Sequence, residues 1–210
     1  MAEQKYNARI LHTSREHDTT LEIVDDGFQR SLHFGTPSRQ SSMYLHAPDK
    51  LALSYTRAMM TGLLFCPNPE RVLLIGLGGG SIAKFLLRHF PACQIDAVET
   101  SEEVIKLARA YFQLPESPQL NIYVGDGARL TQALPSQRSP YDLLLVDAFT
   151  DKGVPEAFLQ DGFFSTCRAK LRPNGVFVAN LWAGPTTGFY GALRHLREHF
   201  DDNVLQLPVE

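Results

Sequence analysis

The chain has 210 residues, which fits one domain or one domain with a small appendage. Hydrophobic residues make up 44% of it, enough for a core, and a net charge of −3 gives no electrostatic reason to expect nucleic acid. No segment approaches the roughly 18 apolar residues of a membrane-spanning helix. The three cysteines lie far apart, which excludes a CxxC metal site and is typical of reduced thiols. We therefore expect a cytoplasmic protein with neither a nucleic-acid nor a membrane partner.

The N-terminal part of the chain has the texture of a small β-sheet. We predict an N-terminal β-domain over residues 1–47 and a second domain over 48–210, with a hairpin turn at Asp25-Asp26-Gly27. A β-segment of this size is not stable alone, so it either packs on the rest of the chain or pairs with a second copy. The expected strands are at 8–12, 20–24 and 28–34, and the first and last of them are expected to have exposed edges.

From residue 48 onwards, helical and strand patterns alternate. Leu51 to Leu64 is apolar at helical spacing, and Pro67-Asn68-Pro69 ends that helix. The alternation predicts an α/β fold with a Rossmann-like, doubly wound parallel sheet, to which the small N-terminal β-segment is attached. The strands are predicted at 71–76, 94–99, 120–125, 141–147, 174–181 and 203–208, and the helices at 81–90, 101–112, 127–134, 160–171 and 186–200.

A glycine turn joins the first of these strands to its helix. The apolar run from Val72 to Ile75 ends in four glycines out of five residues, and a helical pattern begins near Ser81. In such an arrangement the backbone can approach a nucleotide without interference from Cβ atoms. The glycines expected to contact the nucleotide are Gly76, Gly78 and Gly80.

Three acids follow three consecutive strands, whose carboxyl ends share one edge of a parallel sheet. Glu99 stands where an acid usually holds a ribose diol; the alternative is a cap for the following helix. Asp126, followed by Gly127, either contacts the adenine or caps the next helix, and the two roles are compatible. Asp147 ends a buried strand, where a lone carboxylate is poorly solvated unless it faces a cleft, so we assign it to the site.

An NAD-binding Rossmann domain is the nearest alternative. It has Gly or Ala at the sixth position of the turn, where this chain has Ser81. The acids after the third and fourth strands fit better with a ligand whose adenosine and sulfonium ends are both held by carboxylates. S-adenosylmethionine, or a relative of it, is such a ligand. It would act as a co-substrate, and we expect no permanently bound cofactor.

From roughly Asp25 to Leu181 the chain resembles the spermidine synthase family, the polyamine aminopropyltransferases, and most of all a divergent bacterial branch of it. The resemblance implies a small β-domain on a methyltransferase-like Rossmann domain, and a homodimer. The matching pieces are Tyr55, Val72 to Gly80, Val98-Glu99 with Glu103-Val104, Gly125-Asp126-Gly127, Tyr141 to Asp147, Phe163, and Leu171 to Val178.

The resemblance also implies roles. Glu99 would hold the ribose, Asp126 with Gly127 the adenine, and Asp147 would be the base near the amine nucleophile, which the Tyr55 hydroxyl helps to orient. The donor would be decarboxylated S-adenosylmethionine.

Three positions depart from the family pattern. Gly79 stands where the family has an aspartate, Arg57 replaces the acid two residues after the tyrosine, and Thr150 replaces a second aspartate, although Asp151 adjoins it. In the family these acids hold the cationic ends of a diamine, which needs carboxylates in place of its lost hydration. We therefore predict retained nucleotide binding and poor activity with putrescine.

Three functions remain open. They are aminopropyl transfer to a small-molecule amine in polyamine biosynthesis, methyl transfer from S-adenosylmethionine, and non-catalytic nucleotide binding. Asp147 favours the first two, and the lost acids favour the third. We predict no metal site. The run His195-Leu-Arg-Glu-His199 matches a zinc-protease arrangement, but we interpret it as a solvated helix face.

Overall fold

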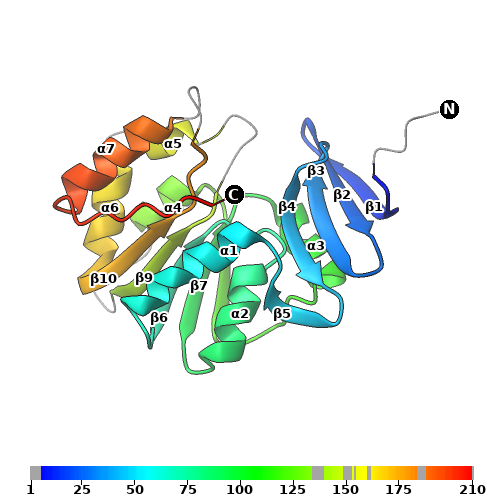
Figure 1. Cartoon of the computed structure of the whole chain (residues 1–210), viewed down its shortest axis with the longest axis horizontal. Helices are drawn as coiled ribbons and strands as arrows, with labels where there is room; N and C mark the ends of the chain where they lie inside the picture. The colour runs from blue at the N-terminus through cyan, green and yellow to red at the C-terminus, as the bar shows by residue number, and fades with distance from the viewer. Residues whose placement is uncertain are drawn as a thin grey trace.

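A computed structural model of the chain shows two five-stranded sheets, an antiparallel one near the N-terminus and a parallel one after it (Figure 1). The structure describes residues 6–133, 140–148, 153, 155–159, 162–183 and 188–209. The arrangement confirms the predicted α/β fold with a small N-terminal β-segment. In the described ranges, no helix has both the length and the hydrophobicity to cross a membrane.

The antiparallel sheet is a meander in which each strand pairs with the next. Its strands are β1 (Arg9–Glu16), β2 (Thr19–Asp25), β3 (Gln29–Phe34), β4 (Arg39–Tyr44) and β5 (Ala47–Leu51). The sequence patterns predicted neither β4, whose residues are mostly polar, nor β5, which contains Pro48. The edges are β1 and β5. The exposed edge expected at 28–34 is therefore wrong, because β3 pairs with β2 on one side and β4 on the other.

One face of this sheet packs on the rest of the chain. Leu21, Leu32 and Met43 form a buried cluster with Leu107 of helix α3 (Glu102–Tyr111) and Phe112 after it. Strand β4 also reaches the glycine turn, where the hydroxyl of Ser81 donates to the carbonyl of Ser42 at 3.1 Å. Of the two arrangements expected for the β-segment, packing on the rest of the chain is present. The division of the chain at residue 47 stays a prediction.

The parallel sheet has the strand order β10-β9-β6-β7-β8. The order reverses beside β6, so the connections after β6 and β9 diverge at the carboxyl edge, which is where such sheets bind ligands. The strands are β6 (Arg71–Ile75), β7 (Gln94–Glu99), β8 (Leu120–Val124), β9 (Tyr141–Val146) and β10 (Leu171–Ala179).

Besides α3, the helices are α1 (Ser54–Met59), the 3-10 helix η1 (Met60–Leu64), α2 (Ser81–His89), α4 (Gly127–Ala133), α5 (Glu156–Leu159), α6 (Phe163–Lys170) and α7 (Phe189–His199).

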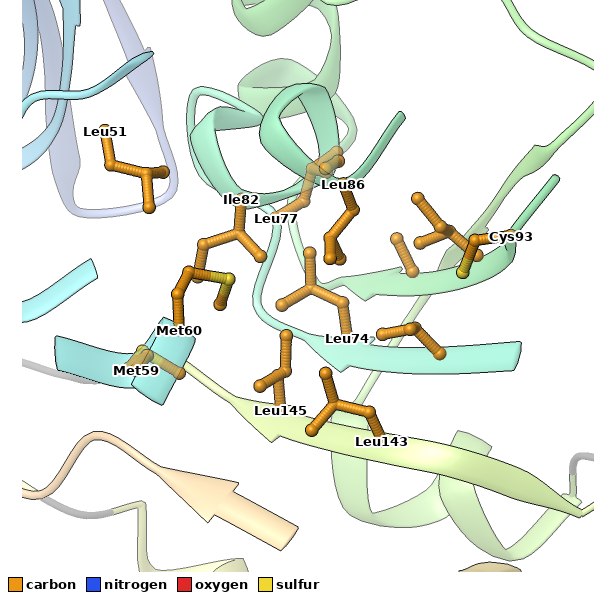
Figure 2. Close-up of a cluster of buried hydrophobic side chains, with 14 of the residues drawn as sticks. Leu51, Met59, Met60, Leu74, Leu77, Ile82, Leu86, Cys93, Leu143 and Leu145 are labelled. Atoms are coloured by element: carbon orange, nitrogen blue, oxygen red, sulfur yellow. The ribbon is translucent and has the colours of Figure 1, made fainter. Parts of the chain in front are cut away.

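Helices cover both faces of the parallel sheet, which confirms the doubly wound arrangement. On one face, Leu74 and Leu145 meet side chains of α1, η1 and α2, including Met60 and Leu86 (Figure 2). On the other, alternate strand residues such as Leu144 belong to a buried cluster with residues of α6 and α7. Because both faces of the central strands β6 and β9 are buried, these two strands read as nearly continuous apolar runs.

Two predicted elements differ from the structure. The strand expected at 203–208 is wrong: residues 203–209 form no strand, and the side chains of Leu205 and Leu207 are 81% and 58% exposed. Apolar spacing suggested the strand, but a strand also needs a hydrogen-bonded neighbour. The helix expected at 160–171 is shorter, because α6 begins at Phe163 directly after Gly162, whose φ is 111°, and ends at Lys170. The short helix α5 lies before the predicted range.

Candidate active site

The site lies at the carboxyl edge of the parallel sheet. There the backbone hydrogen bonds continue one residue beyond the ends of three strands. The amide of Gly76 donates to Val98 O at 2.9 Å, that of Asp147 to Ile75 O at 2.8 Å, and that of Asn180 to Val146 O at 2.9 Å. These bonds fix the backbone at the carboxyl ends of β6, β9 and β10. Residues from three separate connections therefore meet at one edge of the sheet.

The first glycine of the turn has a structural requirement of its own. Gly76 has a φ of +93°, and a Cβ there would lie 2.2 Å from the carbonyl oxygen of Asp147. Any other residue would push the turn away from Asp147. Gly78 and Gly80 also have positive φ angles, at 53° and 73°. The turn therefore brings bare backbone close to the Asp147 strand end.

Glu99 is the last residue of β7, and its side chain reaches the glycine turn after β6. Its Oε2 accepts hydrogen bonds from the amides of Leu77 and Gly78, both at 3.1 Å. Its Oε1 accepts from the amides of Thr100 and Ser101 at 2.8 and 3.2 Å. The cap of α3 is Ser101, whose hydroxyl accepts from Val104 N at 2.9 Å. Glu99 is thus more than a helix cap, because it connects the strand end to the turn.

Asp126 caps helix α4, which is one of the two roles expected for it. Its Oδ1 accepts from the amide of Arg129 at 2.9 Å, and its Oδ2 accepts no hydrogen bond from the part of the chain that the structure describes. Gly127 begins the helix, where a Cβ would lie 2.7 Å from the Ile75 side chain. The structure thus brings Asp126 and Gly127 to the same edge of the sheet as Glu99. Their role with adenine stays a prediction.

The carboxylate of Asp147 is held by two neutral donors. The Tyr55 hydroxyl donates to Oδ2 at 3.2 Å, and the Asn180 amide donates to Oδ1 at 3.1 Å. Burial raises the pKa of Asp147 to about 6; the bonds from Asn180 and Tyr55 oppose this shift, and the nearby charge of Glu99 adds to it. A carboxylate with this pKa is ionised at neutral pH and is a much better proton acceptor than an ordinary aspartate.

Helix α1 places Tyr55 beside Asp147, 92 positions further along the chain. Met59 and Met60 anchor the helix in the core under the sheet face (Figure 2). Burial first, and then the Asp147 charge, raise the pKa of Tyr55, so its hydroxyl keeps its proton and acts as a donor. The predicted pair of Tyr55 and Asp147 is in direct contact.

Two of the three positions that depart from the family pattern, Arg57 and Gly79, add no acid to this centre. Arg57 donates to the backbone carbonyls of Leu51 and Ala52 at 3.0 and 2.8 Å, so its cation is tied to the turn before α1. At Gly79 a Cβ would lie 2.7 Å from Ser41 Oγ and 3.0 Å from the Phe112 ring, so a longer side chain needs one of these to move. Thr150 and Asp151 lie outside the described residues.

The described residues contain no group of three or more His, Cys, Asp or Glu placed to hold a metal ion. In the histidine run of α7, His195 stacks on Phe164 with ring centroids 6.1 Å apart, and its Nδ1 lies 3.3 Å from Glu198. His195 therefore packs on α6, which differs from the fully solvated face expected for this run.

Two neighbours of the site were given no role by the sequence analysis. Asn180 follows the fifth core strand, but its contact with Asp147 depends on the register of two parallel strands. Ser41 reaches the glycine turn from β4, a strand that its polar sequence did not reveal. A polar residue directly after an apolar strand was the only available signal for Asn180.

The fold and this edge define a nucleotide-binding α/β protein of the methyltransferase type. The sequence model of the spermine/spermidine synthase domain matches residues 53–181. The chain belongs to the spermine/spermidine synthase family.

Among the similar proteins, the polyamine aminopropyltransferase of Chromobacterium violaceum is 40% identical over 190 residues, which cover 90% of this chain and 71% of the relative. The protein of the same name from Neisseria meningitidis serogroup A is 37% identical over 212 residues, which cover 100% of this chain and 78% of the relative.

Solved structures show the same fold. A probable spermidine synthase from Corynebacterium glutamicum superimposes with a TM-score of 0.76 at 24% identity, covering 92% of this chain and 71% of the other. Human methyltransferase-like protein 13 in complex with SAH has a TM-score of 0.63 at 28% identity, covering 70% of this chain and 73% of the other.

Proposed function

We propose that the protein transfers an aminopropyl group from decarboxylated S-adenosylmethionine to a small amine. The observation that carries this proposal is the half-buried Asp147 carboxylate, held by the neutral groups of Tyr55 and Asn180 at the edge that also carries the glycine turn. The similarity to proteins named polyamine aminopropyltransferase supports the same reaction class.

The donor binds along the edge from β6 to β8. Glu99 takes the ribose hydroxyls, exchanging its 3.1 Å bonds to Leu77 and Gly78 for shorter ones to the ligand. Asp126, whose Oδ1 is used by the α4 cap, offers Oδ2 to the adenine beside Gly127. The backbone of Gly76, Gly78 and Gly80 lines the path to Asp147.

At Asp147 the reaction is a displacement at carbon. The amine nitrogen attacks the methylene carbon beside the sulfonium, a new C–N bond forms, and the C–S bond breaks with its electron pair going to sulfur. The products are methylthioadenosine and the alkylated amine, whose extra proton passes to the Asp147 carboxylate. Because the sulfonium is already a good leaving group, the protein chiefly aligns the nitrogen and removes the proton. The Tyr55 hydroxyl, 3.2 Å from Asp147, orients the amine.

Methyl transfer is the second candidate, and one comparison favours it. The human protein named eEF1A lysine and N-terminal methyltransferase is 31% identical over 147 residues, although these make up 62% of this chain and only 21% of that protein. The same donor edge would serve S-adenosylmethionine, with S-adenosylhomocysteine as the product.

One incubation distinguishes the candidates. The protein is mixed with an equimolar pair of decarboxylated and ordinary S-adenosylmethionine and a panel of mono- and diamines, and the thioether products are identified by mass spectrometry. Methylthioadenosine supports the proposal, and S-adenosylhomocysteine supports methyl transfer. Binding of thioethers without turnover of either donor supports a non-catalytic role. We expect putrescine to be a poor acceptor, since Gly79 and Arg57 supply no carboxylate for its second ammonium.

We further propose a cytoplasmic homodimer. The exposed edge of β1 offers unpaired backbone groups to a second copy, and the family resemblance points to the same assembly. The three cysteines are free and buried, which supports a reducing compartment. A monomer by light scattering at micromolar concentration would refute the dimer.

A further inference from the structure

We propose that Asn180 is a positioning residue, which fixes the carboxylate plane of Asp147 so that its proton-accepting lone pair faces the acceptor amine. The inference deepens the proposed function and rests on Asp147 being the base of that reaction.

The contact begins from two anchored points. The Asn180 amide N–H is bonded to Val146 O, and that of Asp147 to Ile75 O, so both residues extend the ladder of the sheet by one position. From these fixed backbones, Asn180 Nδ2 reaches Asp147 Oδ1 at 3.1 Å. Because the backbones of both residues are fixed, the Asp147 carboxylate that they join has little rotational freedom. Such restriction is the condition for precise alignment of a base.

The two oxygens of Asp147 are held from opposite parts of the fold. Asn180 binds Oδ1 from β10, and Tyr55 binds Oδ2 from α1. With one donor on each oxygen, rotation about the bond to the carboxyl carbon breaks both contacts. Each oxygen keeps lone-pair capacity for the proton, because a carboxylate oxygen accepts about two hydrogen bonds.

The donor is neutral, and this matters for the chemistry. An arginine or lysine at position 180 would orient the carboxylate equally well but would make it a weaker proton acceptor. An amide leaves the effect of burial in place, so the pKa of Asp147 stays raised, at about 6. The ionisable groups that act on Asp147 in the described chain are Tyr55, which keeps its proton, and Glu99, whose charge also raises the pKa.

The test compares Asn180→Ala and the isosteric Asn180→Asp with the unmodified protein. We expect kcat to fall by about 10- to 100-fold in Asn180→Ala, the usual scale for losing a group that orients an active residue. The affinity for methylthioadenosine, measured by calorimetry, should stay unchanged. The acidic limb of the kcat–pH profile should move to higher pH, because a donor that stabilises the ionised form is lost. Asn180→Asp should move it further, because two carboxylates then share one site.

A matched control comes from the same sheet. Asn121 donates from Nδ2 to Asp96 Oδ1 at 2.9 Å, so Asn121→Ala also removes an asparagine donor from a buried aspartate, away from the site. It should lower stability and leave the pH limb unmoved. If Asn180→Ala behaves like Asn121→Ala, with an unmoved limb and an unchanged kcat, the positioning role is overturned.

A second measurement keeps the inference separate from the proposed reaction. The pKa of the Asp147 carboxyl is followed by carbon NMR in the unmodified protein and in Asn180→Asp, which preserves the shape of the side chain. A higher pKa in the variant supports the contact even if no amine is turned over, a result that would refute only the proposed function. An unchanged pKa overturns the role of Asn180.

Discussion

The parallel sheet holds carboxylates near both ends of its strands, and their surroundings differ. Towards the amino ends, the buried Asp96 is paired with Arg71 at 2.9 Å and the buried Asp142 with Arg172 at 2.8 Å. Near the carboxyl ends, the half-buried Asp147 accepts from the hydroxyl of Tyr55 and the amide of Asn180. Among the described residues, arginine compensates the carboxylates at the amino ends, whereas neutral groups hold Asp147.

The difference separates structure from chemistry. Asp96 also accepts from the Tyr141 hydroxyl of β9 at 2.7 Å, and Asp142 from the Arg71 amide of β6 at 2.8 Å, so each links different strands of the sheet. Asp147 links β9 to α1 and β10 too, but within the described ranges no cation pairs with it, and burial raises its pKa. A desolvated carboxylate held by neutral donors is a candidate for function, because packing alone gives no reason to keep it.

The largest expected effect follows from replacing the uncompensated acid. Asp147→Asn keeps shape and hydrogen bonding but removes the proton acceptor, so turnover should fall by about 10²–10⁴-fold, the scale of general-base catalysis. Affinity for methylthioadenosine should change little. Steady-state kinetics and calorimetry check both. A loss of affinity parallel to the loss of rate would mean that Asp147 anchors the ligand instead.

Replacing an arginine-paired aspartate near the amino ends of the strands should lower the stability of the protein and leave its turnover rate unchanged. Asp96→Ala leaves the Arg71 guanidinium, the Tyr141 hydroxyl and the Asn121 amide without their acceptor. We expect the free energy of unfolding to fall by about 2–4 kcal/mol, below the full range for broken buried pairs because Arg71 is partly exposed. Denaturant unfolding measures it. The control is Asp18→Ala, whose ion pair with Arg15 is fully exposed and should matter little. A loss of turnover without a loss of stability in Asp96→Ala would contradict the comparison.

Glu99 tests a third setting, a carboxylate bonded to backbone amides. Glu99→Ala should weaken methylthioadenosine binding by about 1–3 kcal/mol, the cost of leaving ligand hydroxyls without a partner. Unfolding without ligand is measured alongside, because Glu99 also contacts the turn at Leu77 and Gly78. The control is Glu102→Ala, an exposed acid three residues away in the first turn of α3. Equal weakening in both variants would point to long-range charge instead of a ribose contact.

The sequence predicted what local patterns encode. Apolar runs, the glycine turn and acids at strand ends were sufficient to predict the parallel sheet and to bring Glu99, Asp126 and Asp147 to one edge. Tyr55 came from the family resemblance alone, because its contact with Asp147 joins an α1 residue to a strand end 92 positions away.

What could not be predicted depends on pairing between distant segments. Strand β4 has the mostly polar sequence Arg39-Gln-Ser-Ser-Met-Tyr44, in which only Met43 joins the apolar cluster, and its pairing with β3 and β5 holds it in the sheet. Conversely, the apolar stretch at 203–208 has the composition of a strand and no paired neighbour. Asn180 gained its role from the register of β10 on β9, which no single-strand pattern contains.

The smallest expected effect is a pH-dependent gain in stability when the uncompensated charge is removed. In the folded protein the pKa of Asp147 is about 6, above the usual value of 3.8, so the folded state holds this proton more tightly than the unfolded state. The favourable contribution of the group is therefore complete below about pH 4 and is lost as the pH rises through 6. Asn does not titrate, so the stability of Asp147→Asn relative to the unmodified protein should rise between pH 4 and 7 and then level off.

A pKa of about 6 against 3.8 corresponds to at most about 3 kcal/mol over this pH range, at about 1.4 kcal/mol per unit of pKa. We expect a smaller gain, on the order of 1 kcal/mol, because solvent screens the charge of this partly exposed residue. Urea unfolding of both proteins at several pH values from 4 to 8 measures it, with Asp18→Asn as a control whose difference should stay flat. A variant that loses stability relative to the unmodified protein as the pH rises would show that Asp147 is compensated after all, and the contrast between the two ends of the sheet would fail. A gain confined to the carboxyl end would show that the fold gives up stability at Asp147 to keep an ionised base there.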